Sequence, residues 1–247
     1  MFNLTSFLLT SIAGLSTLFG AFIIFFSRKK SDSIIIASLG FASGVMILVS
    51  FTDLIPNSFK LFNNIYSNVF SILLILFAIN IGIVLSKGIN KFIPNDDNKL
   101  YRVGILSMIA IMLHNIPEGM ATYITNSTNI SLGLSLTIAI AAHNIPEGIS
   151  IAVPIFYSTG SKYKAFLYTF ISGISELFGA ILAYVFLAPF ISDTFMAFLY
   201  ATIAGIMIYL SITELLKTSL SYKNYKLTYI YVFIGIIFIL FNHFIFN

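Results

Sequence analysis

Residues 113–122 read LHNIPEGMAT and residues 142–151 read AHNIPEGISI, so the hexapeptide HNIPEG occurs twice in this chain. In each copy a histidine and a glutamate stand four residues apart, which places both side chains on one face of a helix. Both copies lie inside long apolar segments, where an ionisable group costs at least about 2.5 kcal/mol. The repeated motif therefore predicts two helices that direct the same groups toward one functional site.

The composition around these motifs indicates a membrane protein. Of the 247 residues, 58% are hydrophobic and only 9% are charged, whereas about a quarter of the residues in a soluble domain are charged. We therefore predict an all-α integral membrane protein with one polytopic domain over residues 1–247. The chain has no cysteine, so disulfides and thiolate metal sites are excluded.

Eight apolar stretches are long enough to cross the hydrocarbon core of a bilayer as helices, which takes about 20 residues. Short polar breaks separate them, and the longest break, 88–100, is predicted to be a cytoplasmic loop. The eight predicted spans are residues 4–27, 34–56, 68–87, 101–125, 130–156, 164–188, 193–216 and 227–246.

The basic residues predict the orientation in the membrane. Of 13 lysines and arginines, only Lys60 lies in an even-numbered loop, and the others gather at the odd-numbered loops. Because cytoplasmic loops are enriched in lysine and arginine, both termini are predicted to be extracytoplasmic, in a multi-pass protein of the cell membrane. The formal net charge of +4 reflects this placement and does not indicate a nucleic-acid partner.

The remaining residues of each motif add to the predicted site. Asn115 and Asn144 offer an amide oxygen beside each imidazole. The proline of each motif removes a backbone N–H, which predicts broken helices with free carbonyls at Leu113 and Ala142. The glycine of each motif permits close helix approach. Imidazole, carboxylate and amide oxygen together suit zinc, iron, manganese or cobalt.

The two motifs are predicted to lie at the same depth. His114 is 13 residues from Tyr101 at the start of its span, and His143 is 13 residues from Ile130 at the start of the next. Consecutive spans run antiparallel, so this equal spacing indicates an inverted repeat near mid-membrane. Secondary transporters place their ion sites at such repeat interfaces.

A third span adds Glu176, in the segment SGISELFGA. Three carboxylates, those of Glu118, Glu147 and Glu176, are too much negative charge for one desolvated divalent ion. We therefore expect two metal ions, bridged by Glu118 and Glu147.

These features resemble the ZIP family (Zrt-, Irt-like proteins) and most of all its bacterial ZupT-type branch. The resemblance covers the whole chain in span number and orientation, and its specific part is the two HNIPEG motifs with SGISE. It implies an eight-helix bundle, often a homodimer, that carries zinc, and in some members iron, manganese, cobalt or cadmium, toward the cytoplasm.

The resemblance also implies two neighbouring metal positions. One would use the histidines and glutamates of both motifs. The other would use the asparagines and glutamates of both motifs with Glu176. The ligands of the first position are His114, Glu118, His143 and Glu147, and those of the second are Asn115, Glu118, Asn144, Glu147 and Glu176.

Four further polar residues lie within the apolar segments. Asp53, near the outer end of its span, is read either as a cation attractant at the entrance or as an interfacial residue. Glu214, close to Lys217, is read either as part of an exit path or as an interfacial ion pair. Asn80 is expected to bond between helices, and His243, in an apolar segment with no acidic neighbour, is not expected to be a ligand.

An enzyme is the alternative function: an intramembrane zinc-dependent hydrolase. Such a helix would carry HExxH, with a glutamate beside the first histidine as the general base. Here that position is Asn115 or Asn144, so the motif offers ligands without a base. Two symmetric copies also suit a transport path better than a one-sided catalytic pocket, so transport is the preferred prediction.

Overall fold

The computed structural model describes residues 3–26, 31–92, 98–187 and 192–246, and all regular elements within these ranges are helical. Within the described residues, eight helical units are long and apolar enough to cross a membrane, which confirms the predicted fold class. The elements are α1 (Leu4–Ala21), α2 (Ile23–Phe26), α3 (Asp32–Val49), η1 (Ser50–Leu54), α4 (Ile55–Asn63), α5 (Asn68–Phe92), α6 (Lys99–Thr128), α7 (Ile130–Thr159), α8 (Lys162–Leu182), η2 (Ala183–Leu187), α9 (Asp193–Leu210), η3 (Ser211–Leu216), α10 (Lys217–Ser221) and α11 (Tyr225–Phe246).

Several helices are longer than the apolar stretches that predicted them. The second span continues through η1 and α4 to Asn63, and α5 runs through residues predicted as loop to Phe92. Polar residues at a helix end can reach water without leaving the helix, so hydropathy alone underestimates its length. The predicted loop residues Arg28, Lys29, Lys30, Asp96, Asp97 and Pro189 lie outside the described residues.

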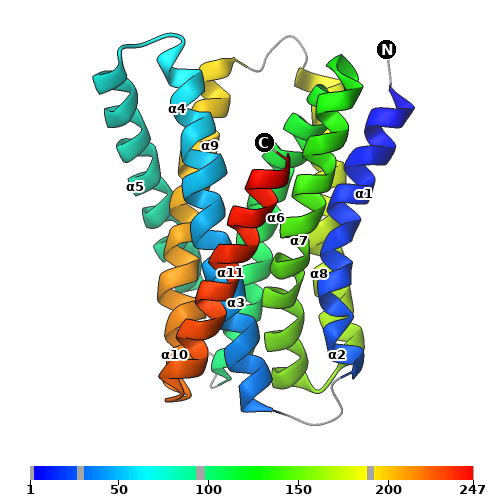
Figure 1. The fold of residues 1–247 in the computed structure, drawn as a ribbon, viewed down its shortest axis with the longest axis vertical. Coiled ribbons are helices and arrows are strands. Elements are labelled where there is room, and N and C mark those ends of the chain that lie inside the picture. Colours follow the sequence, from blue (N-terminus) through cyan, green and yellow to red (C-terminus); the bar gives the residue numbers. More distant parts are fainter. Residues whose placement is uncertain (1–2, 27–30, 93–97, 188–191, 247) are drawn as a thin grey trace.

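The helices form one upright bundle with two distinct ends (Figure 1). At the upper end in this view lie the start of α1 and the turn between α6 and α7, and α11 runs toward the same end; we refer to it as the terminal end. At the lower end α5 finishes, α6 and α8 begin and α10 lies; we refer to it as the basic end, because it carries the lysines of these elements.

Glycines bring the helix backbones into direct contact around the two motifs. A Cβ atom on Gly119 would overlap the carbonyl oxygen of Glu176 on α8, and one on Gly148 would overlap that of Thr17 on α1. Small residues of this kind are what membrane helices use to pack closely. The glycine of each motif therefore fixes its helix against a neighbour, as the sequence predicted.

The largest apolar cluster lies in the half of the bundle nearer the basic end. It joins the start of α3 and α6 to the end of α7 and α9, and includes Leu39, Leu106, Ile151 and Met207. Smaller clusters around Phe62 and Met120 lie toward the terminal end. Large apolar side chains on α5 and α11 point outward, as expected for helices that face lipid. Packing thus closes the bundle below the motifs and leaves the side nearer the terminal end for a cavity.

Candidate metal centre

The two HNIPEG motifs are brought together by a hairpin of α6 and α7. Only Asn129 separates the helices, and its side-chain oxygen accepts hydrogen bonds from the backbone N–H groups of Ser131 (3.1 Å) and Leu132 (3.2 Å). His114 lies 15 residues before Asn129 and His143 lies 14 residues after it. At 1.5 Å per residue both histidines stand about 22 Å from the turn, at nearly equal depth.

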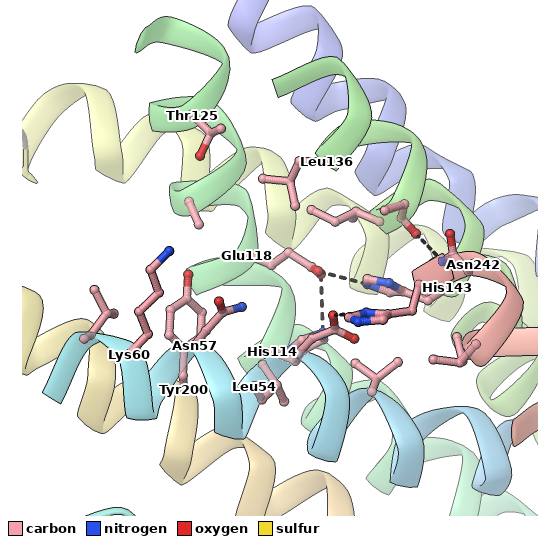
Figure 2. A pocket seen from close by; sticks show the side chains of 18 residues that line it. Leu54, Asn57, Lys60, His114, Glu118, Thr125, Leu136, His143, Tyr200 and Asn242 are labelled. Carbon is pink, nitrogen blue, oxygen red and sulfur yellow. Dashed lines mark hydrogen bonds and ion pairs between the residues drawn. The ribbon is translucent and has the colours of Figure 1, made fainter. Parts of the chain in front are cut away.

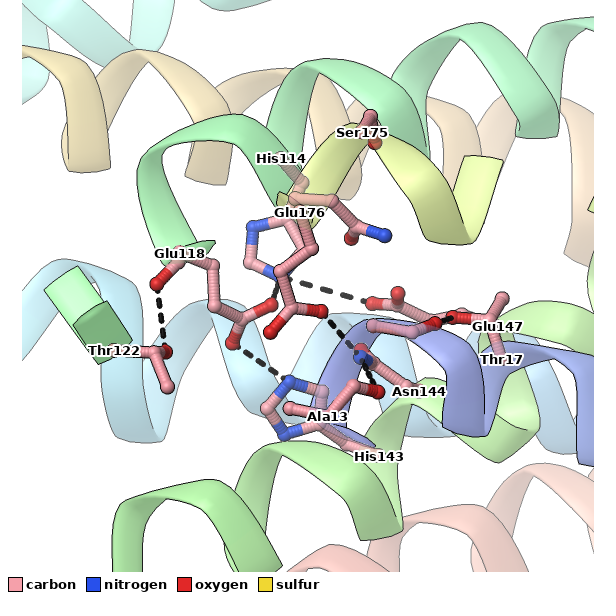
Figure 3. Close-up of polar contacts among 12 residues, drawn as sticks. Ala13, Thr17, His114, Glu118, Thr122, His143, Asn144, Glu147, Ser175 and Glu176 are labelled. Carbon is pink, nitrogen blue, oxygen red and sulfur yellow. Dashed lines mark hydrogen bonds and ion pairs between the residues drawn. The ribbon is translucent and has the colours of Figure 1, made fainter. Parts of the chain in front are cut away.

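The imidazoles of both motifs converge on one carboxylate (Figure 3). His143 Nε2 lies 2.9 Å from Glu118 Oε1, and His114 Nε2 lies 3.3 Å from Glu118 Oε2. His114 Nε2 is also 3.8 Å from Glu147 Oε1. One ligand atom from each of His114, Glu118 and His143 falls within 4.8 Å of the others. This is the spacing that a single metal ion needs to draw the three together.

These groups are buried and many of their polar atoms lack a hydrogen-bond partner. His114 is 2% exposed, and Glu147 and Glu176 are fully buried. Both carboxylate oxygens of Glu147, Oε2 of Glu118 and Oε1 of Glu176 accept no hydrogen bond. Among the described residues, no lysine or arginine forms an ion pair with these carboxylates. Buried charges are ordinarily paired or bound to metal, so a cation is the fitting partner.

The asparagines and Glu176 form a second layer beside this cluster (Figure 3). The Asn144 side chain donates to Glu176 Oε2 and to the carbonyl oxygen of Ala13, both at 2.9 Å. The Asn115 side chain donates to the carbonyl oxygen of Ser172 at 3.2 Å. Both amide oxygens have no hydrogen-bond donor. The hydrogen bonds thus fix the amide nitrogens on the neighbouring helices and leave both amide oxygens available as ligands.

The structure corrects the prediction that the motif prolines break their helices. Pro117 and Pro146 both lie inside continuous α-helices of 30 residues each. Proline removes one hydrogen bond but does not end a helix whose neighbours hold it in place. The glycine contacts two residues after each proline, at Gly119 and Gly148, supply that support.

A cavity of about 400 Å³ leads from the terminal end to the cluster (Figure 2). Residues of α4, including Asn57 and Lys60, line its outer part, and Tyr200 of α9 lies beside them. His114, Glu118 and His143 line its floor. The candidate metal ligands are therefore reachable from one end of the bundle.

Asp53 and His243 meet in the same cavity, which corrects the prediction that His243 has no acidic neighbour. His243 Nδ1 on α11 lies 3.7 Å from Asp53 Oδ1 on η1. The two side chains remain 42% and 34% exposed. The sequence reasoning missed this pair because the residues are far apart in the chain, and only the packing of α3 and η1 against α11 joins them.

Glu214 lies on the side of the basic end and is partnered by Asn90, which the sequence did not predict. Its Oε1 accepts a hydrogen bond from the Asn90 side chain at 3.0 Å. Asn80 does not bond between helices: its side chain donates to the carbonyl oxygen of Leu76, one turn earlier on α5. Asn80 therefore forms a hydrogen bond within its own helix in place of the predicted bond between helices.

The chain was compared with known proteins. The ZIP zinc transporter family matches residues 94–243. The chain is 39% identical to a zinc transporter ZupT of Campylobacter jejuni, over 88% of each chain, and 38% identical to one of Streptococcus mutans, over 90% of each. One of Nitratidesulfovibrio vulgaris is 36% identical over 94% of this chain and 93% of its own. These relatives are named as transporters, which removes the support for a hydrolase. The chain belongs to the ZIP zinc transporter family.

Proposed function

We propose that this protein carries zinc across the cell membrane into the cytoplasm through the centre formed by its two HNIPEG motifs. The observation that carries this proposal is the buried convergence of His114, Glu118 and His143 on the floor of a cavity open to one end. Membership of a zinc transporter family supports the cargo. Mixed imidazole and oxygen ligands without thiolate also favour transport, because the site must both load and release its ion.

The proposed route begins at the terminal end, which the distribution of lysine and arginine assigns to the extracytoplasmic side. Asp53, with His243 beside it, would collect the hydrated cation at the cavity mouth. The ion would then lose water as it meets the motif histidines and Glu118. Iron, manganese, cobalt and cadmium are further candidate cargoes for this donor set.

We propose a binuclear centre, with Glu118 and Glu147 bridging the two ions. The unpartnered oxygens of Glu147, Glu176, Asn115 and Asn144 support a second position beside the first. Equilibrium zinc binding to the purified protein should give two ions per chain, and Glu176→Ala should bind one. A single ion in both proteins would contradict the second position. Assembly as a homodimer remains a prediction from the family resemblance.

Transport itself is tested by zinc uptake into proteoliposomes that contain a zinc-sensitive dye. We expect Glu118→Ala to lower the initial rate at least about tenfold, because loss of a ligand weakens metal binding on that scale. Asn80→Ala is the control, since the Asn80 side chain donates to a carbonyl of its own helix and is not among the residues that line the cavity. Uptake by Glu118→Ala at the wild-type rate would overturn the proposal.

A further inference from the structure

Two segments of the chain share a sequence pattern and an unusual local structure. Residues 44–54 read GVMILVSFTDL and residues 205–215 read GIMIYLSITEL. Each passes from α-helix into a π-helical turn, η1 or η3, and these turns carry Asp53 and Glu214 at equivalent positions. π-helical turns within α-helices are rare and frequently lie at functional sites.

Reciprocal hydrogen bonds join the two spans that carry these segments. Ser58 of α4 donates to the carbonyl oxygen of Ala197 on α9 at 2.7 Å. Ser219 of α10 donates to the carbonyl oxygen of Ile36 on α3 at 3.0 Å. Each serine follows its acidic residue by five positions, so the two bonds are equivalent. Asp53 and Glu214 are therefore counterparts in a symmetric pair of spans, one toward each end of the bundle.

The environments of these counterparts differ. Asp53 lines the large cavity and is about one-third exposed. Glu214 lines a small cavity of about 20 Å³. The amide nitrogen of the Asn90 side chain donates a hydrogen bond to Glu214. The side-chain oxygen of Asn90 accepts hydrogen bonds from Arg102 Nε at 3.1 Å and from Arg102 Nη2 at 2.5 Å. The backbone oxygen of Asn90 also accepts from Arg102 Nη2, at 2.8 Å. An amide thus stands between the carboxylate and the guanidinium.

Helix α6 connects this network to the metal centre. Arg102, Leu106, Ala110, His114 and Glu118 follow one another at intervals of four, so each is the neighbour of the next along a ridge that winds around the helix. Leu106 and Ala110 line the small cavity together with Glu214. Among the described residues that line this cavity, Glu214 carries the only charge, and Leu106 and Ala110 form an apolar barrier between Arg102 and His114 on the ridge.

We propose that Glu214 is a second, transient binding site for the divalent cation, and that Asn90 and Arg102 form a latch that closes it. This inference rests on the proposed transport function. While the large cavity is open at the terminal end, the Asn90 side chain is hydrogen-bonded to the Glu214 carboxylate and to Arg102. These bonds connect α5, α6 and η3. A cation that crosses the apolar barrier replaces the Asn90 amide on Glu214, which releases Arg102 and opens the basic end.

The latch is tested through thiol accessibility, since the natural chain has no cysteine. Leu106→Cys places one thiol in the small cavity, and a charged methanethiosulfonate is added from the basic end. Asn90→Ala should raise its reaction rate about tenfold, the scale of one lost hydrogen bond to a charged group. Asn80→Ala, on the same helix, should leave the rate unchanged. An equal rate in Asn90→Ala would overturn the latch.

Two further measurements separate loss of the latch from misfolding and test the cation site itself. A thiol in the large cavity, Leu136→Cys, must still react from the terminal end in the Asn90→Ala background, which shows that the variant is folded. Glu214→Gln keeps an acceptor for Asn90 but loses the charge; it should lower zinc flux at least about tenfold while zinc affinity at the HNIPEG centre is unchanged. Wild-type flux in Glu214→Gln would overturn the second cation site. Absent flux in the unsubstituted protein would instead contradict the proposed function.

Discussion

Single side chains at the candidate metal centre explain why we propose that it binds a cation. The Nε2 atoms of His114 and His143 lie 3.3 Å and 2.9 Å from the Glu118 carboxylate. Several carboxylate oxygens beside them have no hydrogen-bond partner. A cluster of this kind leaves buried carboxylates without a positive partner. A metal ion supplies that charge, and imidazole and carboxylate bind it in their deprotonated forms.

Acidification should therefore weaken zinc binding. Between about pH 7.5 and about pH 5.5 we expect the affinity to fall at least about tenfold, because protons compete with the metal ion for imidazole and carboxylate ligands. Isothermal titration of the purified protein measures the change. In His114→Gln with His143→Gln the remaining dependence should be smaller. Equal zinc affinity at both pH values would contradict imidazole ligation.

At the scale of the helices, close backbone packing holds the motifs in register. Gly119 lies against the Glu176 backbone, and Gly179 of α8 lies against Ile116 of α6. Two glycines thus clamp α6 to α8 on either side of the motif glutamate. The same contact brings Glu176 beside the centre, because its own backbone is part of the interface.

Gly119→Ala should destabilise the protein and weaken zinc binding together. The added Cβ overlaps backbone, which cannot rotate away, so we expect a cost of about 1–3 kcal/mol and a lower melting temperature in detergent. Gly88→Ala is the control, since Gly88 is helical with nothing within 4 Å of an added Cβ. That variant should be neutral or slightly more stable. Equal melting temperatures for the two variants would argue against the clamp.

The helices and the clustering of the motif side chains were predictable because lipid imposes strong local rules. An ionisable residue in an apolar span is costly, so the sequence alone indicates a functional site at four such residues. They are His114, Glu118, His143 and Glu147. The pairing of Asp53 with His243 and of Glu214 with Asn90 was not predictable, since each depends on which helices meet. The prediction that Pro117 and Pro146 break their helices was wrong, because packing against neighbouring helices decides whether a proline interrupts a helix.

On the scale of the whole molecule, the two ends of the bundle differ in both charge and packing. The largest apolar cluster lies in the half nearer the basic end, and the cavity opens toward the terminal end. A transporter with one open side must reverse this arrangement to release its cargo. The equivalent segments around Asp53 and Glu214 offer a symmetric framework for that reversal.

The distribution of lysine and arginine predicts the membrane orientation, and engineered thiols test this prediction. A membrane-impermeant maleimide added to intact cells should label Thr128→Cys, near the α6–α7 turn, and leave Tyr163→Cys at the start of α8 unlabelled, although both side chains are exposed. Permeabilised cells should show labelling of both. The reverse pattern in intact cells would place the termini in the cytoplasm.

The most direct test of the central claim is X-ray diffraction from zinc-loaded crystals at the zinc absorption edge. Our account predicts anomalous density between α6 and α7, with His114 Nε2, His143 Nε2 and Glu118 at metal–ligand distances of about 2.0–2.2 Å. A neighbouring peak at Glu147 and Glu176 would mark the second ion. Zinc bound elsewhere, with both histidines free of metal, would contradict the claim that the paired HNIPEG motifs hold the cargo.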